Sequence, residues 1–416
     1  MRLPDQSPDG NTKNKVKLAY LVSHPIQYQA PLLRRIAQEP DIELTVFFAS
    51  NFSVQQYVDK GFGVDVKWDV PLLEGYRYEF LPVIWDKRRT GPTAQLNYGI
   101  FSRLRGDKDG REFDVLWVHG YSTLNALQAM LMAKALGIPV LLRAESRLAG
   151  KQTGTLKQIA KRLFFSGLKL LIDAVLPIGS LNADYWRHTL GEELPQFPMP
   201  YAVDNDYFQS RRRDADLRRG DLLRELGLDA SRPIILFASK LQRRKRCEDL
   251  LDAYLSLCSE ISSEPIPYLL IVGDGEERAA LERRVSSAAS GVRFCGFRNQ
   301  SELPFFFSLA TAFVLPSQDE PWGLIVNEAM NSGCAVILSD DVGCQPDLIT
   351  DGVEGYVFPV GDGNALKHAL RRVLRSPETA EIMGQRGLKR ISQWSYEEDI
   401  VGLRRAIAVV TRRLSM

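Results

Sequence analysis

The alternation of short apolar runs with amphipathic stretches constrains this chain most, because the chain passes through such a series twice. The first series contains VKLAYLVS, IELTVFFA, FDVLWVH, IPVLLRA and DAVLPIG, with the helix-like stretches APLLRRIAQ and STLNALQAMLMAKALG between them. Strands that are buried on both faces form nearly continuous β-branched runs, and their alternation with helices gives a parallel sheet covered on both sides. The first series therefore predicts one doubly wound α/β domain.

The second series follows a polar segment near residue 200 and contains PIILFAS, YLLIVG, VRFCG, TAFVLP and AVILS. The chain has 416 residues, which suits two domains of roughly 200 residues each. We predict two Rossmann-like domains that face each other across a cleft. The predicted boundaries are a disordered lead-in over 1–15, an N-terminal domain over 16–200, a C-terminal domain over 201–394, and a helix over 395–416 that packs back on the N-terminal domain.

The composition narrows the function classes. A net charge of +2 provides no field for binding nucleic acid. No apolar run approaches the roughly 18 residues that span a bilayer, and the polar N-terminal stretch lacks the apolar core of a secretory signal. The five cysteines form no CxxC pair and fit reduced thiols. We therefore expect a cytoplasmic protein that does not bind nucleic acid.

Two glutamates in LPSQDEPWGLIVNEAMNSG are the most informative residues. Pro321 suits the first turn of a helix, which places Glu320 at the mouth of that helix. Unpaired amides at a helix start, together with the helix dipole, bind anions such as a diphosphate. The amides concerned belong to Gly323, Leu324 and Ile325. Glu328 lies about two turns further on, where a carboxylate can accept two hydrogen bonds from a ribose diol.

Two lysines follow a strand of the second series, in FASKLQRRKRCEDLL. Lys240 and Lys245 would neutralise negative charge on a leaving nucleoside diphosphate. The alternative is a solvated basic loop, because three arginines crowd the same stretch. We expect the two lysines to matter more for turnover than for folding.

The segment EPWGLIVNEAMNSGCAVILSD resembles the E-x7-E signature of the family 4 glycosyltransferases, which have the GT-B fold and retain anomeric configuration. KLQRRKRCEDLLDAY, LLIVGDGEERAALE, VRFCGF and DLITDGVEGYVFPVGD follow the order of that family, whereas only SHPIQYQAPLLRRI and LWVHGYST resemble it in the first half. The family usually has Gly-Arg and Lys-Gly where this chain has Ser239-Lys240 and Lys245-Arg246. The resemblance implies transfer of a sugar from a UDP- or GDP-linked donor to an acceptor hydroxyl in polysaccharide or glycolipid assembly. The nucleotide-sugar is then a substrate, and no cofactor is expected.

The remaining candidates follow strand ends, which face the cleft in such folds. Gly273 marks a tight turn near the donor, and the resemblance places Phe297 near the nucleotide base, although core packing is an equal alternative. His24 suits either a sugar or phosphate contact or a structural role. For His119, the resemblance favours contact with the sugar, and we group it with Glu320, Lys240 and Lys245 as catalytic.

On the acceptor side, many relatives in the family have a second histidine where this chain has Arg143 and Glu145, so we list these two residues there. Residues 155–171 form a basic amphipathic stretch, which we interpret as an ordinary surface helix, with peripheral contact to the inner face of the membrane as the alternative.

Two Asp-x-Asp copies, at 204–206 and 214–216, do not follow a strand, so we predict no metal requirement. A sugar-nucleotide epimerase on the same scaffold and a non-catalytic nucleotide-sugar-binding subunit remain alternatives. The expected partners are a nucleotide-sugar and a saccharide or lipid-linked saccharide acceptor.

Overall fold

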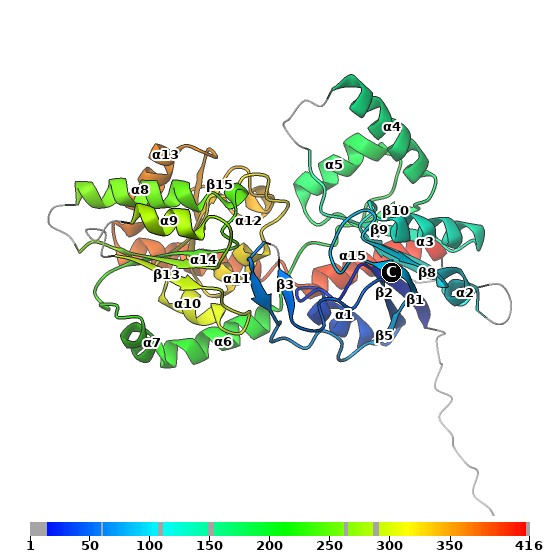
Figure 1. Ribbon diagram of the computed structural model, residues 1–416, viewed down its shortest axis with the longest axis horizontal. Coiled ribbons are helices and arrows are strands. Elements are labelled where there is room, and N and C mark those ends of the chain that lie inside the picture. Colours follow the sequence, from blue (N-terminus) through cyan, green and yellow to red (C-terminus); the bar gives the residue numbers. More distant parts are fainter. Residues whose placement is uncertain are drawn as a thin grey trace, which may run out of the picture.

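The computed structural model describes residues 15–59, 61–106, 111–148, 154–261, 265–285 and 291–412. The predicted disordered lead-in therefore lies outside the described residues, apart from Lys15. Two α/β domains lie side by side, and a helix that follows the second domain in the chain returns to the first (Figure 1).

The N-terminal sheet has six parallel strands in the order β10-β9-β8-β1-β2-β5. Numbered along the chain, these strands follow the 3-2-1-4-5-6 order of a Rossmann domain, which reverses between β1 and β8. Their bounds are Val16–Val22 (β1), Ile42–Phe48 (β2), Arg77–Phe80 (β5), Val115–His119 (β8), Val140–Arg143 (β9) and Ala174–Val175 (β10). The helices of this domain are Ala30–Ala37 (α1), Ile100–Arg105 (α2), Leu124–Ala135 (α3), Thr155–Lys169 (α4) and Ser180–Leu190 (α5).

The C-terminal sheet repeats this topology with the order β13-β12-β11-β14-β15-β16, again fully parallel. Its strands are Ile234–Ala238 (β11), Tyr268–Val272 (β12), Val292–Gly296 (β13), Ala312–Leu315 (β14), Ala335–Ser339 (β15) and Gly355–Phe358 (β16). Its helices are Asn205–Leu217 (α6), Arg219–Glu225 (α7), Cys247–Glu260 (α8), Arg278–Arg284 (α9), Leu303–Leu309 (α10), Leu324–Asn331 (α11), Gln345–Leu348 (α12), Gly363–Leu374 (α13) and Pro377–Ile391 (α14), with a 3-10 turn at Arg243–Lys245.

Each sheet carries an apolar core on both faces, which explains the unbroken apolar runs of its central strands. In β11, for example, alternate residues enter opposite cores, with Leu236 on one face and Phe237 on the other. The two sheets thus act as rigid platforms whose carboxyl-end loops form the cleft.

Helix α15, Tyr396–Thr411, packs on the N-terminal domain although it follows the C-terminal domain in the chain (Figure 1). Ser395 and Glu398 form a reciprocal capping box at its start. Its apolar side chains, including Ile400 and Leu403, join the same core as β1 and β2. The helix therefore completes the N-terminal domain.

Two small antiparallel ribbons interrupt the N-terminal alternation between β2 and β8. One pairs Tyr57–Asp59 (β3) with Val64–Val66 (β4), and β3 lies beside the C-terminal domain in Figure 1. The other pairs Val83–Asp86 (β6) with Gln95–Asn97 (β7). In the described part of the chain, no helix is both long enough and apolar enough to cross a membrane.

Candidate active site

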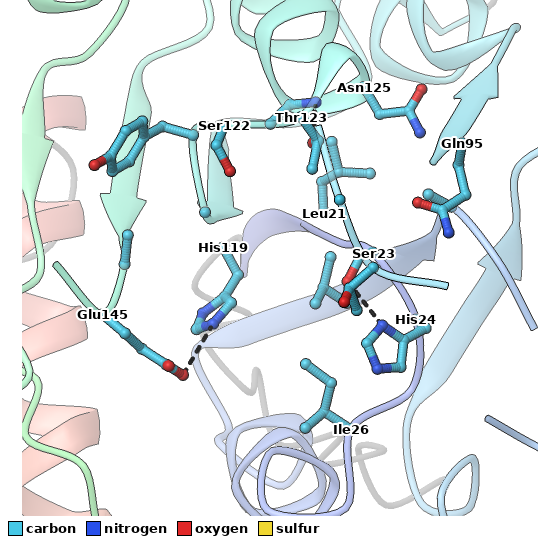
Figure 2. Close-up of a pocket in the computed structure, with 18 of the residues that line it drawn as sticks. Leu21, Ser23, His24, Ile26, Gln95, His119, Ser122, Thr123, Asn125 and Glu145 are labelled. Carbon is cyan, nitrogen blue, oxygen red and sulfur yellow. Dashed lines mark hydrogen bonds and ion pairs between the residues drawn. The ribbon is translucent and has the colours of Figure 1, made fainter. Parts of the chain in front are cut away.

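Two adjoining hollows occupy the cleft. The histidine pocket, of about 560 Å³, lies at the ends of β1 and β8 and is lined by residues that include Ser23, His24, His119 and Glu145 (Figure 2). The interdomain pocket, of about 710 Å³, is lined by side chains of both domains. Both pockets are lined by His24 and Thr90, so they adjoin at these two residues.

His119 ends β8 and lines the histidine pocket, with its side chain 11% exposed. Gln29 accepts a hydrogen bond from the hydroxyl of Tyr20 at 2.7 Å, so its amide nitrogen, 3.0 Å from His119 Nε2, is the donor to that atom. The ring proton of His119 then resides on Nδ1, which is buried and has no hydrogen-bond partner among the described residues. Burial, followed by the charges of Arg143 and His24, lowers the pKa of His119 to about 3. His119 is therefore a neutral hydrogen-bond donor at neutral pH.

His24 follows β1, and its Nδ1 lies 2.8 Å from Ser23 Oγ. Its ring packs against Phe52 with the ring centroids 4.4 Å apart. Burial lowers the pKa of His24 to about 4, although nearby Asp86 opposes this shift. Both histidines thus contribute hydrogen bonds to the pocket rather than positive charge.

Glu145 provides the carboxylate of the histidine pocket. It accepts hydrogen bonds from the hydroxyls of Tyr28, at 2.8 Å, and Tyr201. Its Oε1 lies 4.0 Å from His119 Nε2, and Figure 2 shows the carboxylate directed toward that ring. Burial and then the charge of Glu145 raise the pKa of both tyrosines well above the usual value. The tyrosine protons therefore stay in place and hold the carboxylate.

Arg143, which we placed on the acceptor side, does not line either pocket. Its side chain is buried, donates to the carbonyls of Met199 and Pro200, and forms a 2.9 Å ion pair with Asp399 of α15. The prediction is wrong because the return of α15 covers this strand end. Arg143 instead ties α15 to the N-terminal sheet.

Lys240 follows β11 and lines the interdomain pocket, where it meets a carboxylate of the other domain. Its Nζ lies 2.8 and 3.0 Å from the two oxygens of Asp59, and 4.7 Å from the ring centroid of Phe62. Asp59 also accepts the backbone N–H groups of Gly61 and Phe62. Burial opposes ionisation of Asp59, but the bonds from Lys240 and these amides outweigh it and lower the pKa of the carboxyl.

Lys245 and Glu320, predicted separately as donor contacts, pair with each other. Both side chains are buried, and Arg244 adds a 3.3 Å bond to the same carboxylate. Burial lowers the pKa of Lys245, while the charge of Glu320 opposes this shift. Because removal of one partner leaves a buried charge unpaired, we expect loss of Lys245 to lower the stability of the protein as well as its turnover.

Helix α11 begins at Leu324 rather than at Pro321. Gly323 is the residue before it and adopts a left-handed conformation with φ of 93°, which glycine allows without strain. The first-turn prediction for Pro321 is therefore wrong, and Glu320 instead pairs as an isolated bridge with Val342. Gly323, Leu324 and Ile325 nevertheless line the interdomain pocket. The amide-bearing helix start thus lies in the same pocket as Lys240 and Lys245.

The other donor-side candidates lie behind this surface. Glu328 is buried on α11 with Oε2 unpartnered among the described residues, and burial raises its pKa to about 8. Phe297 packs against Phe62, 4.8 Å between ring centroids, and does not line the pocket. Gly273 has φ of +132°, and a Cβ there would lie 1.9 Å from the carbonyl oxygen of Ser239. Gly273 thus allows the loop that carries Lys240 to pass closely.

Sequence reasoning missed the three charged pocket residues that come from the two ribbons: Asp59, Arg88 and Arg89. They lie where the regular alternation stops, so the strand-end rule did not apply. The one available signal was the basic run at 87–89. Among the described residues, no group of three or more His, Cys, Asp or Glu side chains could hold a metal ion.

Residues 219–390 match the model of the family Glycosyl transferases group 1 in sequence. The C-terminal domain is a group 1 glycosyltransferase domain. It contains Lys240, Lys245, Glu320 and Glu328, whereas the residues that line the histidine pocket, apart from Pro321, lie outside the matched range.

Known glycosyltransferases resemble part of this chain in sequence. N-acetyl-alpha-D-glucosaminyl L-malate synthase of Bacillus anthracis is 27% identical over 43% of this chain and 46% of its own length. Alpha-maltose-1-phosphate synthase of Mycobacterium tuberculosis is 32% identical over 43% of this chain and 49% of its own length. The chain thus spans about half the length of the curated relatives it matches.

Solved structures extend the fold similarity to the whole chain. Sucrose-phosphate synthase from Thermosynechococcus elongatus superposes with a TM-score of 0.63 at 20% identity, covering 94% of this chain and 97% of the other. HepE from Anabaena, solved with UDP, gives 0.69 at 17% identity, covering 96% and 100%. The glycosyltransferase domain and its N-terminal partner therefore form a GT-B fold.

Proposed function

We propose that this protein transfers a sugar, with retention of anomeric configuration, from a UDP- or GDP-linked donor to an acceptor hydroxyl. The observation that carries the proposal is the composition of the interdomain pocket. On the side of the group 1 domain, the start of α11 lines this pocket together with Lys240 and Lys245. Amides at a helix start and fixed cations are the groups that bind a diphosphate. HepE, a protein of the same fold, was solved with UDP.

The catalytic contribution would be electrostatic. As the sugar leaves, negative charge grows on the diphosphate, and preorganised donors in a water-poor cleft stabilise that charge most effectively. Lys240 and Lys245 would shift from Asp59 and Glu320 toward the phosphates, without a metal ion. Glu320, freed in part from Lys245, would contact the donor sugar, and Glu328 would hold the ribose. His119 would donate its Nδ1 proton to a sugar hydroxyl, and the acceptor proton would pass to the leaving phosphate.

An epimerase on this scaffold would need acids and bases around the sugar that titrate near neutral pH. The two pocket histidines are poorly suited to that role, because their pKa values lie at about 3 and 4. Incubation of nucleotide-sugars without an acceptor separates the alternatives, since an epimerase would convert one of them. A non-catalytic subunit would bind the donor without hydrolysis or transfer.

A thermal-shift panel of UDP, GDP, ADP and their common sugars tests the proposal, because a ligand that binds only the folded state raises the melting temperature. We expect one nucleoside diphosphate to stabilise the protein and its sugar conjugate to be hydrolysed or transferred. Stabilisation by none of these nucleotides would refute the donor assignment.

The acceptor side includes a helix that suits a membrane surface. Leu156, Ile159 and Leu163 lie on one face of α4, and Leu156 is 84% exposed. Helix α4 contains no acidic residue, and Arg162 and Lys169 are among the basic residues beside this face. An exposed apolar face with basic neighbours complements the charge of an anionic bilayer. We propose that α4 brings a cytoplasmic enzyme to the inner face of the membrane, where lipid-linked saccharides would be its acceptors.

Co-sedimentation with vesicles of phosphatidylcholine alone or with phosphatidylglycerol tests this contact. Leu156→Glu with Leu163→Glu should abolish binding to the anionic vesicles. Leu217→Glu is the matched control, because Leu217 is equally exposed, at 87%, but lies on α6 of the other domain. Equal binding by both variants, or concentration-dependent dimerisation that only the α4 variant loses, would contradict membrane docking.

A further inference from the structure

The loop between β6 and β7 brings two arginines to the cleft. Arg88 and Arg89 are exposed, and both line the interdomain pocket from the N-terminal side. The next residue, Thr90, lines both pockets. The two guanidinium groups therefore belong to the boundary between the donor half of the cleft and the histidine pocket.

The charge of these arginines is unbalanced, unlike that of the other cations in the pocket. Lys240 pairs with Asp59, while Lys245 and Arg244 pair with Glu320. Among the described residues, the guanidinium groups of Arg88 and Arg89 form neither an ion pair nor a hydrogen bond. The pocket thus presents two free positive charges, both from the N-terminal domain.

The backbone of this loop is fixed in an unusual conformation. Arg88 has φ of 48°, a left-handed value that is strained for a non-glycine residue. Its N–H donates to Asp86 Oδ1 at 2.7 Å. The carbonyl of Arg89 accepts from the buried amide of Gln95. Such strain persists only where the surroundings enforce it, so the fold holds both arginines at the cleft.

We infer that Arg88 and Arg89 bind a phosphate group carried by the acceptor, an inference that rests on the proposed function. A guanidinium is a planar fork that matches phosphate oxygens with two parallel bonds, and two of them balance a phosphate dianion. The donor diphosphate already has its cations and helix start on the opposite domain. The phosphate of the acceptor would therefore enter from the N-terminal side and direct the acceptor hydroxyl toward the donor sugar.

Calorimetry in the presence of saturating UDP or GDP tests the site, because the nucleotide occupies the donor half. The probes are glucose, glucuronate, inorganic phosphate, glucose 1-phosphate and glucose 6-phosphate, together with phosphatidylcholine vesicles that contain undecaprenyl phosphate. We expect a phosphate-bearing probe to bind, glucose not to bind, and glucuronate to bind more weakly. Binding to soluble sugar phosphates or only to the vesicles would both support the site and would distinguish its source of phosphate.

The double variant Arg88→Ala/Arg89→Ala should weaken this binding at least tenfold and leave nucleotide affinity unchanged. Lys87→Ala is the matched control, because Lys87 lies on the same loop, is exposed and does not line the pocket. Absence of phosphate binding in the wild type, or equal binding by the double variant, would overturn this inference but not the proposed function. If the double variant lost nucleotide affinity as strongly as phosphate affinity, the arginines would bind the donor instead of the acceptor. A wild type that binds no nucleotide would refute the proposed function instead, and phosphate binding would then be measured without it.

Discussion

The two sides of the cleft differ in the charge of their polar side chains. On the C-terminal side, Lys240 and Lys245 are both paired with carboxylates before any donor arrives. On the N-terminal side, burial keeps both histidines neutral. A donor would therefore exchange ion-pair partners in a site that is already charged, whereas the acceptor would be positioned by hydrogen bonds and by the arginines of the β6–β7 loop. We therefore expect donor binding on the C-terminal side to depend mainly on the charges of the lysines. Acceptor binding on the N-terminal side should depend mainly on how the hydrogen-bonding side chains are positioned.

The strongest test of this contrast is Lys240→Ala with Lys245→Ala. Loss of one preorganised donor from a buried site typically costs about 3 kcal/mol of transition-state stabilisation. We expect kcat to fall at least about a hundredfold. The melting temperature should also fall, because Glu320 loses its buried partner. Arg243→Ala is the control, since Arg243 is exposed on the same turn and does not line the pocket. Near-normal kcat in the double variant would show that these lysines do not stabilise the leaving diphosphate.

Glu328→Ala should act on binding rather than on turnover. Removing a charged acceptor from a ribose diol should weaken donor affinity by about 1.5–3 kcal/mol, measured by calorimetry. Because burial raises the pKa of Glu328 to about 8, the carboxyl must lose a proton to accept both bonds. Donor affinity of the wild type should therefore increase from pH 7 to pH 9, and the variant should lose this dependence. Unchanged affinity would remove the ribose assignment.

Asp59→Asn tests whether Lys240 leaves Asp59 to bind the donor diphosphate. The carboxylate competes with the donor diphosphate for Lys240, so its neutral replacement should lower the KM for the donor severalfold. The effect is modest because the Lys240 side chain is 32% exposed, and partly exposed pairs contribute only about 1 kcal/mol. A higher KM would mean that Asp59 positions Lys240 instead of competing for it.

His119→Asn tests the neutral state of this histidine through the stability of the protein. Burial depresses the pKa of folded His119, whereas the unfolded chain takes up a proton near pH 6.5. The unfolded state therefore binds more protons between about pH 6.5 and pH 3, and stability falls as the pH is lowered through that window. Between pH 7 and pH 5, the melting temperature of the variant should therefore fall less than that of the wild type. An equal loss would show that the pKa of His119 is not lowered in the folded protein.

Chelation should have the smallest effect, because the proposed mechanism uses only protein cations. Both Asp-x-Asp copies lie at or in α6, where Asp204 caps the helix and Asp216 pairs with Arg212. Turnover should be unchanged by EDTA. Abolition by EDTA and recovery with magnesium or manganese would contradict the metal-independent mechanism.

The apolar periodicity in the sequence predicts five of the six strands in each sheet, because buried parallel strands leave a continuous signal, whereas β5 and β16 were not predicted. The ribbons escaped prediction, since strands of three or four residues carry no period. The pairing of Lys245 with Glu320 was also missed, because only the fold brings β11 and the segment before α11 together. Arg143 was misplaced for a related reason, since nothing local to β9 shows that α15 will cover its end.

The return of α15 has a consequence for synthesis. A domain usually folds as a unit while the ribosome extends the chain. Here β1 and β2 emerge first, yet Ile400 and Leu403, which complete their core, follow the entire C-terminal domain. The carboxylate that neutralises buried Arg143 arrives on the same helix. The nascent N-terminal domain must therefore wait, with an open apolar face, until the second domain has been made, and a fragment that ends after α14 should be the aggregation-prone form of this protein.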